Sequence, residues 1–323
     1  MSYQRLGWFA ERMIIPTPVA TIVLGVTLSA LLWCDGIELA AAGSVAATSG
    51  AATTSPEAAQ PAVVPHGRAY LFRGAMGPIF SRGMDRLTER IEQVGITANV
   101  YEFTICRIIA ANAIREYREN PAPIILIGHS MGGYCALIFS ELLEAENIPV
   151  GLVVTIDPPQ VSPDVPLNIG RYINIFLSKS VFGGSHMKPK PGYRNHYASF
   201  DLSEHEEVSH INIEKMDAIQ EQLVSKVVQI ATMPAKAEGD ALPLNYVVPP
   251  NAAIELWDSG MSVFARPGDS LQTIAALYHV PLWSVAQVNK GAGNTPLVPG
   301  ERVIVPRHLV PLAEVSAQSP SRR

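Results

Sequence analysis

Residues 124–133 read IILIGHSMGG, and this stretch decides the fold of the central part of the chain. Four apolar residues lead into a glycine-rich turn, and an apolar helical pattern follows through Leu143. A short apolar run that enters a tight turn and leaves as a helix is typical of a buried strand and a covering helix in an α/β sheet. Within the turn, residues 128–132 form the pattern G-x-S-x-G, which presents Ser130 at the carboxyl end of the strand.

Strand and helix patterns alternate on both sides of this turn. Strands are expected at residues 69–72, 98–103, 152–156 and 171–177, and helices at residues 82–94, 108–117 and 213–230. This alternation predicts the α/β class, with a mostly parallel sheet and helices on both faces. The polar segment 178–200 is too long for a tight connection, and it is interpreted either as a lid or substrate rim or as a surface excursion.

The turn and its flanking elements resemble the α/β-hydrolase family, in a short form that covers residues 67–231 and begins at the family's third strand. The resemblance implies that Ser130 is a nucleophile and that the backbone N–H groups of Ala75 and Met131 form an oxyanion hole. Ala75 lies in residues 73–77 (RGAMG), where an arginine stands first and many lipases have a histidine. This difference leaves the donors in place, because they need a glycine-permitted turn and no particular side chain.

A serine hydroxyl becomes a nucleophile when a base accepts its proton, and that base needs an orienting acid. Asp157 ends the apolar strand LVVTI and precedes two prolines, so its carboxylate is expected at the same sheet edge as Ser130. His210 lies in VSHINI, just before the final helix, where the family carries its histidine. The sequence also leaves open Asp164 and Asp201 as the acid, and His196 and His205 as the base.

Residues 262–306 carry the order strand, helix, helix, strand, with Ser270 as a helix N-cap. The segments PGDSLQTIA, VPLWSVAQVN and LVPGERVIVP resemble the LysM domain, in register over residues 254–307. The resemblance implies binding of glycans that contain N-acetylglucosamine, in bacteria chiefly peptidoglycan, between two loops. The implied groove residues are Gly268, Asp269, Ser270 and Leu271 on one loop, and Thr295, Pro296 and Leu297 on the other.

The N-terminal part of the chain predicts export. Residues 13–33 are uncharged over about the length that crosses a bilayer as a helix. Arg5 and Arg12 precede this segment, and no lysine or arginine follows it before Arg68. The positive-inside rule predicts a transmembrane helix that anchors the chain in the inner membrane as a single-pass protein, with its domains in the periplasm. A signal peptide cleaved near residues 40–42, which would release a periplasmic protein, is the alternative.

Composition delimits the remaining regions and excludes several classes of protein. The predicted regions are a cytoplasmic stub with the apolar segment (1–39), an Ala/Ser/Thr/Pro-rich linker (40–66), the hydrolase-like domain (67–231), a second linker (232–253), the LysM domain (254–307) and a tail (308–323). A formal net charge of −5 gives no electrostatic basis for binding nucleic acid. The three cysteines and eight histidines lack metal-ligand spacing, so no metal or other cofactor is expected.

These observations predict a cell-envelope serine hydrolase of the esterase, lipase or thioesterase type. Its substrate would contain an ester or thioester, and its LysM domain would hold it near the cell wall. Two alternatives remain open at this stage. One is a non-catalytic cell-wall binding protein with an inactive hydrolase domain, and the other is an acyltransferase on the same fold.

Overall fold

The computed structural model describes residues 66–232 and 240–312. The predicted anchor at residues 13–33, the alternative cleavage site and nearly all of the first linker lie outside the described residues. Within the described ranges, no helix is both long enough and apolar enough to cross a membrane.

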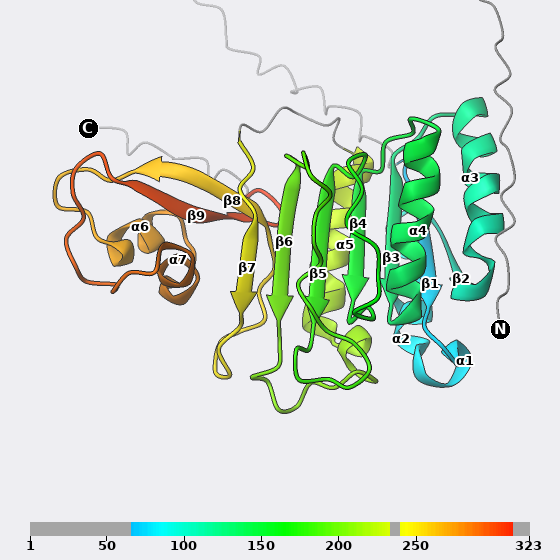
Figure 1. The fold of residues 1–323 in the computed structure, drawn as a ribbon, viewed down its shortest axis with the longest axis horizontal. Coiled ribbons are helices and arrows are strands. Elements are labelled where there is room, and N and C mark those ends of the chain that lie inside the picture. Colours follow the sequence, from blue (N-terminus) through cyan, green and yellow to red (C-terminus); the bar gives the residue numbers. More distant parts are fainter. Residues whose placement is uncertain (1–65, 233–239, 313–323) are drawn as a thin grey trace, which may run out of the picture. The chain divides into compact units, whose positions relative to one another are not determined.

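Seven parallel strands form one sheet in the order β2-β1-β3-β4-β5-β6-β7 (Figure 1). The strands are β1 (Arg68–Arg73), β2 (Thr97–Glu102), β3 (Ile124–His129), β4 (Leu152–Ile156), β5 (Arg171–Phe176), β6 (His196–Asp201) and β7 (Leu244–Val247). Every residue of β3, β4 and β5 is buried, as expected for central strands that are covered on both faces. Because all the strands are parallel, their carboxyl ends meet at one edge, where ligands bind in sheets of this kind.

Helices cover both faces of this sheet, which confirms the predicted α/β class. The helices α2 (Arg82–Gln93) and α5 (Asp217–Thr232) pack on one face, and α3 (Cys106–Glu119) and α4 (Met131–Ala145) pack on the other. On α2, Met84, Leu87 and Ile91 are fully buried and recur at the spacing of one helical face. The short elements between these are α1 (Gly77–Phe80), η1 (Phe103–Ile105) and η2 (Ile213–Lys215).

Two strands lie where the sequence predicts irregular chain. The strand β6 occupies the end of the segment 178–200. Its polar residues mask the apolar pattern of a buried strand in the sequence. One of them, Ser199, is buried because its hydroxyl accepts a hydrogen bond from Asn174 of β5 at 2.9 Å. The strand β7 lies inside the predicted linker 232–253, and it adds Leu244 and Tyr246 to the core. The linker prediction is therefore wrong over β7.

The LysM-like segment folds in the predicted β-α-α-β order. Its elements are β8 (Trp257–Phe264), α6 (Leu271–Leu277), α7 (Leu282–Asn289) and β9 (Arg302–His308), and β8 pairs with β9 in antiparallel register. Ser270 caps α6 in a reciprocal arrangement, since its hydroxyl accepts from the backbone of Thr273 and the Thr273 hydroxyl accepts from the backbone of Ser270. The first residue of β8 is the fully buried Trp257, which lies opposite His308 of β9.

Candidate active site

Ser130 sits between β3 and α4 in a strained backbone conformation, with φ 54° and ψ −124°. A Cβ atom at Gly128 would lie 2.1 Å from the carbonyl oxygen of Gly132, and a Cβ at Gly132 would lie 2.1 Å from the carbonyl oxygen of Phe72. Neither position admits a side chain, which is the physical reason for the two glycines of the motif. The resulting turn holds the serine at the carboxyl edge of the sheet.

The loop after β1 lies directly against the nucleophile. A Cβ at Gly74 would come within 2.8 Å of the Ser130 Cβ. Arg73 fixes the loop, because its Nε donates to Asp85 at 3.1 Å and its Nη1 donates to Glu102 at 2.9 Å. These two bonds hold the end of β1, from which the loop leaves, against α2 and β2.

The two implied oxyanion donors are available on this side of Ser130. Met131 is the first residue of α4, so its N–H has no acceptor in the preceding turn of helix. Within residues 66–232 and 240–312, the N–H groups of Ala75 and Met131 donate no hydrogen bond. Both can therefore donate to an oxygen that is placed next to Ser130.

The structure brings Ser130, His210 and Asp157 together from three segments of the chain. His210 Nε2 lies 3.1 Å from Ser130 Oγ, and His210 Nδ1 lies 2.6 Å from Asp157 Oδ2. Asp157 is completely buried, and its Oδ1 accepts a hydrogen bond from the Leu177 N–H at 3.0 Å. A carboxylate can only accept, so the Nδ1 proton points to Asp157 and the lone pair of Nε2 points to Ser130.

Three of the four other acidic and basic candidates bond elsewhere within the described residues. Asp201 Oδ1 accepts from the backbone N–H groups of Ser178 and Ser203, at 3.1 and 3.0 Å. Burial opposes ionisation of Asp201, but these hydrogen bonds outweigh it and lower the pKa of the carboxyl. His205 Nδ1 bonds to Glu207 at 3.1 Å, His196 lies at the start of β6, and Asp164 makes no bond to His210. Asp201 thus shapes the loop after β6.

His129, which precedes the nucleophile, connects the two halves of the site and was not among the predicted site residues. Its Nε2 bonds to the backbone oxygen of His210 at 2.8 Å, and its Nδ1 bonds to Ser81 Oγ at 2.8 Å. Burial, and next the proximity of His210, lower the pKa of His129 to about 3. The ring is therefore neutral, with Nε2–H donating to His210 and Ser81 donating to Nδ1. Since Ser81 Oγ in turn accepts from the Gly74 N–H at 3.2 Å, one chain of hydrogen bonds links the loop after β1 to His210.

A second titratable group is buried beneath His129. Glu214 of η2 is fully buried, and its Oε2 lies 4.0 Å from His129 Nε2. Burial raises the pKa of Glu214, although Lys215, whose Nζ lies 3.5 Å from Oε1, acts in the opposite direction. Neither carboxyl oxygen has a hydrogen-bond partner among the described residues. No simple sequence signal marks Glu214 as a buried residue. The bonds of His129 could not be predicted either, because a histidine inside G-x-S-x-G has no single role.

A second set of serine, histidine and aspartate lies at the amino edge of the sheet. His196 Nδ1 lies 2.9 Å from Ser259 Oγ and 3.0 Å from Asp258 Oδ2, and both of these partners belong to β8. Arg171 and Lys226 each lie 3.1 Å from the carboxylate of Asp258. Burial opposes the ionisation of Asp258, but the bond to His196 and the two cations lower its pKa to about 2. This cluster joins the parallel sheet to the LysM-like segment.

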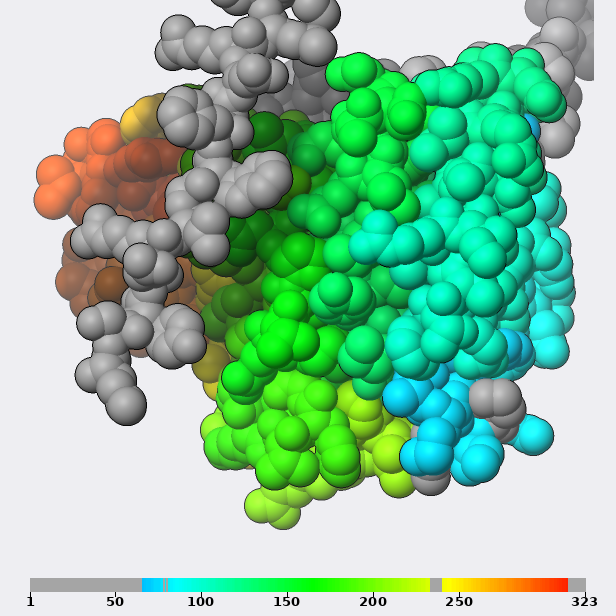
Figure 2. All heavy atoms as spheres, turned by 45° about the vertical axis from the view of Figure 1, so that its right-hand side comes forward, coloured from blue at the N-terminus to red at the C-terminus, as the bar shows by residue number. Residues whose placement is uncertain are grey.

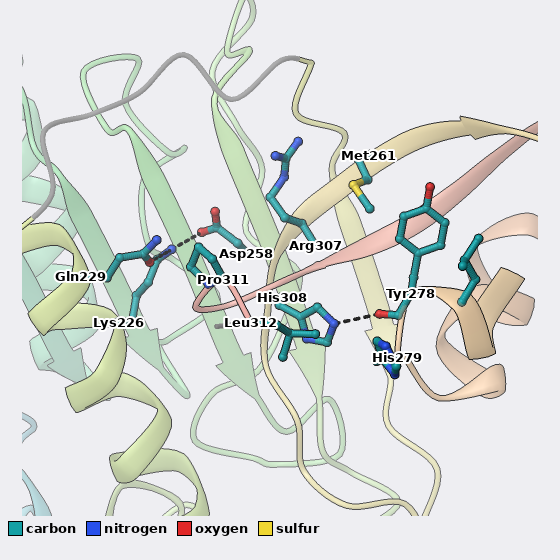
Figure 3. A pocket seen from close by; sticks show the side chains of 11 residues that line it. Lys226, Gln229, Asp258, Met261, Tyr278, His279, Arg307, His308, Pro311 and Leu312 are labelled. Carbon is teal, nitrogen blue, oxygen red and sulfur yellow. Dashed lines mark hydrogen bonds and ion pairs between the residues drawn. The ribbon is translucent and has the colours of Figure 1, made fainter. Parts of the chain in front are cut away.

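Two cavities lie near this junction. The larger, of about 450 Å³, opens between α5 and the LysM-like segment (Figure 3), and the smaller has about 290 Å³. Figure 3 shows Lys226 and Asp258 joined at one side of the larger cavity and His308 bonded to Tyr278 at the other. Neither cavity is lined by Ser130, Asp157 or His210.

The two loops of the predicted glycan groove lie side by side. The Leu297 N–H donates to the Asp269 carbonyl at 2.9 Å, and Ser270 and Pro296 form an isolated bridge. Gly268 has a φ of 87°, a conformation that favours glycine. Leu271 differs from the expectation, because its side chain is buried in the core and only its backbone can face a ligand.

Comparisons with known proteins identify one domain of the chain. Residues 265–306 match the family model of the LysM domain, so this part of the chain is a LysM domain. A comparison with curated protein sequences found no match.

Two solved structures are similar to part of the chain. One is described as a candidate hydrolase of the alpha/beta superfamily from Xanthomonas campestris pv. campestris, with 16% identity, a TM-score of 0.27, and coverage of 38% of this chain and 76% of that one. The other is an esterase domain of a Rhodothermus marinus protein, with 15% identity, a TM-score of 0.27, and coverage of 39% and 69%.

Proposed function

We propose that the chain is a serine hydrolase that cleaves an ester or a thioester through an acyl-enzyme. One observation carries this proposal: His210 bonds through its two different nitrogens to a buried carboxylate and to the hydroxyl of Ser130. That hydroxyl belongs to a residue held in a strained turn beside two available N–H donors. Nucleophile, base, orienting acid and oxyanion donors are the complete set that acyl transfer requires.

The proposed reaction has two halves. Ser130 Oγ attacks the carbonyl carbon while its proton moves to His210 Nε2, and the N–H groups of Ala75 and Met131 hold the resulting oxyanion. Asp157 stabilises the imidazolium, which then gives its proton to the departing alcohol or thiol, and the acyl group stays on Ser130. A water molecule next gives its proton to Nε2 as its oxygen attacks the acyl carbon. The bond between that carbon and Ser130 Oγ then breaks, His210 returns the proton to Oγ, and the acid leaves. Protons and bonds balance without a metal or another cofactor.

The function is tested by hydrolysis of p-nitrophenyl acetate with the full chain. Ser130→Ala should remove nearly all activity, because no other group on the site can carry the acyl chain. The matched control is Ser259→Ala, which removes the serine of the amino-edge cluster and should leave the rate per folded molecule unchanged. Equal activity in Ser130→Ala and the wild type would contradict the proposal.

The proposed place of action is the cell envelope, with the LysM domain bound to peptidoglycan or another glycan that contains N-acetylglucosamine. The apposed loops at Asp269 and Leu297 support this proposal. Sedimentation of the full chain with purified peptidoglycan tests it. Acyl transfer is the second candidate, and it is separated from hydrolysis by mass spectrometry of the product, as free acid in water or as acylated glycan when peptidoglycan is present.

The proposed location is the inner membrane, with residues 13–33 as a single-pass anchor and both domains in the periplasm. The support is the distribution of charge around that segment, with Arg5 and Arg12 before it and no basic residue after it until Arg68. An alkaline phosphatase fusion near Ser55 should be active. An inactive fusion, with an active cytoplasmic reporter at the same position, would contradict export.

A further inference from the structure

Exposed apolar side chains are concentrated on the loops that carry the catalytic groups. Six large apolar side chains on the four loops after β1, β4, β5 and β6 are more than half exposed, and we call them the apolar rim: Met76, Ile79, Val161, Val181, Phe182 and Ile211. All four loops leave the carboxyl edge of a parallel sheet, so the rim surrounds the edge that presents Ser130. Figure 2 shows the segment after β1 (blue) and the loops after β5 and β6 (green to lime) together at the lower end of the molecule.

The apolar rim is continuous with the catalytic groups. Met76 follows the donor Ala75, and Ile211 follows the base. The Phe182 ring lies against the His210 ring, with centroids 5.5 Å apart. A molecule whose carbonyl is placed at Ser130 therefore lies over the rim on at least two sides.

The loop that carries Phe182 is held in place, so its exposure is built into the fold. A Cβ at Gly183 would lie 2.7 Å from the backbone oxygen of Asp157, and Gly184 adopts a φ of 93°. The Gly184 N–H also donates to the carbonyl of Pro158 at 3.2 Å. These contacts fix Phe182 and Val181 as outward-facing residues next to the base.

Several charged groups on or next to these loops have partners among the described residues. Lys179 bonds to Glu204 at 2.9 Å, and Lys215 bonds to the backbone oxygen of Ile211 at 2.6 Å. Arg73 is held by its two carboxylates under the oxyanion loop. The apolar rim therefore offers apolar contact area next to charged groups such as Lys179 and Glu204, which bond to each other.

We propose that the apolar rim binds the acyl chain of the substrate, so that the enzyme prefers medium- or long-chain acyl esters over acetyl esters. This inference rests on the proposed serine hydrolase function and names its substrate class. Contact with apolar side chains removes apolar area of the chain from water, and this gain grows with each methylene. An acetyl group, such as one carried by a glycan, has no methylene and is too short to contact the apolar rim.

The test compares p-nitrophenyl acetate with p-nitrophenyl octanoate, with both esters kept as monomers and the full chain in one nanodisc preparation. For partly buried methylenes we expect kcat/KM to be about tenfold to a hundredfold higher for the octanoate. Ile79→Ser and Val181→Ser should each lower the ratio of kcat/KM for the octanoate to kcat/KM for the acetate several-fold. The matched control is Val298→Ser, an equally exposed apolar residue of the LysM domain, which should change neither value.

The outcomes separate this inference from the function on which it rests. Equal kcat/KM for the two esters, or a preference that both rim variants retain, would overturn the inference and leave the hydrolase intact. No hydrolysis of either ester would overturn both. If the rim variants instead weaken a concentration-dependent self-association without changing the preference, the rim is a contact between copies of the chain and the inference is wrong.

Discussion

The two edges of the sheet carry the same three residue types in different arrangements. At the carboxyl edge, His210 uses Nδ1 for Asp157 and Nε2 for Ser130, so a proton can pass from the serine while the carboxylate holds the ring. At the amino edge, Ser259 and Asp258 both approach the same nitrogen, Nδ1 of His196, and no relay between them through the ring is possible. Proximity of serine, histidine and aspartate is therefore not sufficient for a proton relay. The relay also requires that the serine and the aspartate bond to different nitrogens of the imidazole.

The two groups of residues also differ in the charges that surround them and in their exposure to solvent. Asp258 is surrounded by Arg171, Lys226 and His196, and Ser259 is fully buried. Ser130 is partly exposed in a strained turn, and His210 is its only side-chain hydrogen-bond partner among the described residues. The amino-edge cluster is therefore expected to stabilise the fold, and the arrangement at the carboxyl edge supports the proposed reaction.

Replacement of the aspartate at each edge should give the largest effects, on kcat at the carboxyl edge and on stability at the amino edge. Asp157→Asn keeps the shape of the residue but offers His210 a donor, which favours the wrong tautomer. We expect kcat to fall about 10⁴-fold, as for the equivalent change in a serine protease, with little change in the free energy of unfolding. Steady-state kinetics and urea unfolding measure the two quantities. A near-normal kcat would remove Asp157 from the mechanism.

Asp258→Asn should give the opposite result. Removal of this carboxylate takes an ion-pair partner from two buried cations, so the free energy of unfolding should fall by about 3 to 5 kcal/mol. The value of kcat per folded molecule should not change, because the cluster lies at the far edge of the sheet. Urea unfolding followed by tryptophan fluorescence reports the first quantity, since Trp257 is the neighbour of Asp258 in β8. Unchanged stability would show that the cluster does not hold the junction.

His129 provides a smaller effect that sharpens the account of the reactive edge. His129→Gln keeps a donor toward the His210 carbonyl, whereas His129→Asn is too short to reach it. We therefore expect kcat to fall about tenfold to a hundredfold in the asparagine variant, with partial rescue in the glutamine variant and little change of KM. Equal rates for the two variants would mean that the bond to His210 does not position the base.

The same residue predicts a dependence of stability on pH. The pKa of His129 is about 3 in the folded chain, whereas a histidine in an unfolded chain has a pKa of about 6.5, so the unfolded chain binds more protons between these values. Stability should consequently fall as the pH falls from 6.5 toward 3. Glu214, Lys215 and His210 face this ring and are common to the wild type and the variant. Urea midpoints between pH 7 and pH 4 should therefore fall less in His129→Asn than in the wild type.

The smallest expected effect concerns the glycan groove of the LysM domain. Thr295→Arg should weaken co-sedimentation with peptidoglycan several-fold, because it fills the space between two apposed loops. Ala276→Arg adds the same charge on the exposed side of α6 and should not weaken it. Retention should change little up to about 0.3 M salt, since all but one of the predicted groove residues are uncharged. Identical behaviour of the two variants would place the binding surface elsewhere.

Local patterns were sufficient to place Ser130 and Asp157 at the same edge of the sheet. The strand before Ser130, the glycines around it and the strand before Asp157 are each continuous in sequence, and parallel topology brings their ends together. The amino-edge cluster was not predictable, because its four charged or titratable groups come from β5, β6, α5 and β8 and none lies in a motif. The strands β6 and β7 were missed because polar residues and prolines interrupt or surround the apolar pattern. The partners that distinguish His196 from His210 lie far from each histidine in the sequence, so the residues next to either histidine do not reveal them.

The central claim, that Ser130 alone is the activated serine, is tested most directly by labelling with a fluorophosphonate and locating the adduct by mass spectrometry. The account predicts one adduct, on the peptide that contains Ser130. The adduct should be absent in Ser130→Ala, strongly slowed in His210→Ala and unchanged in Ser259→Ala. An adduct on another serine, or a labelling rate in Ser130→Ala equal to that of the wild type, would contradict the account.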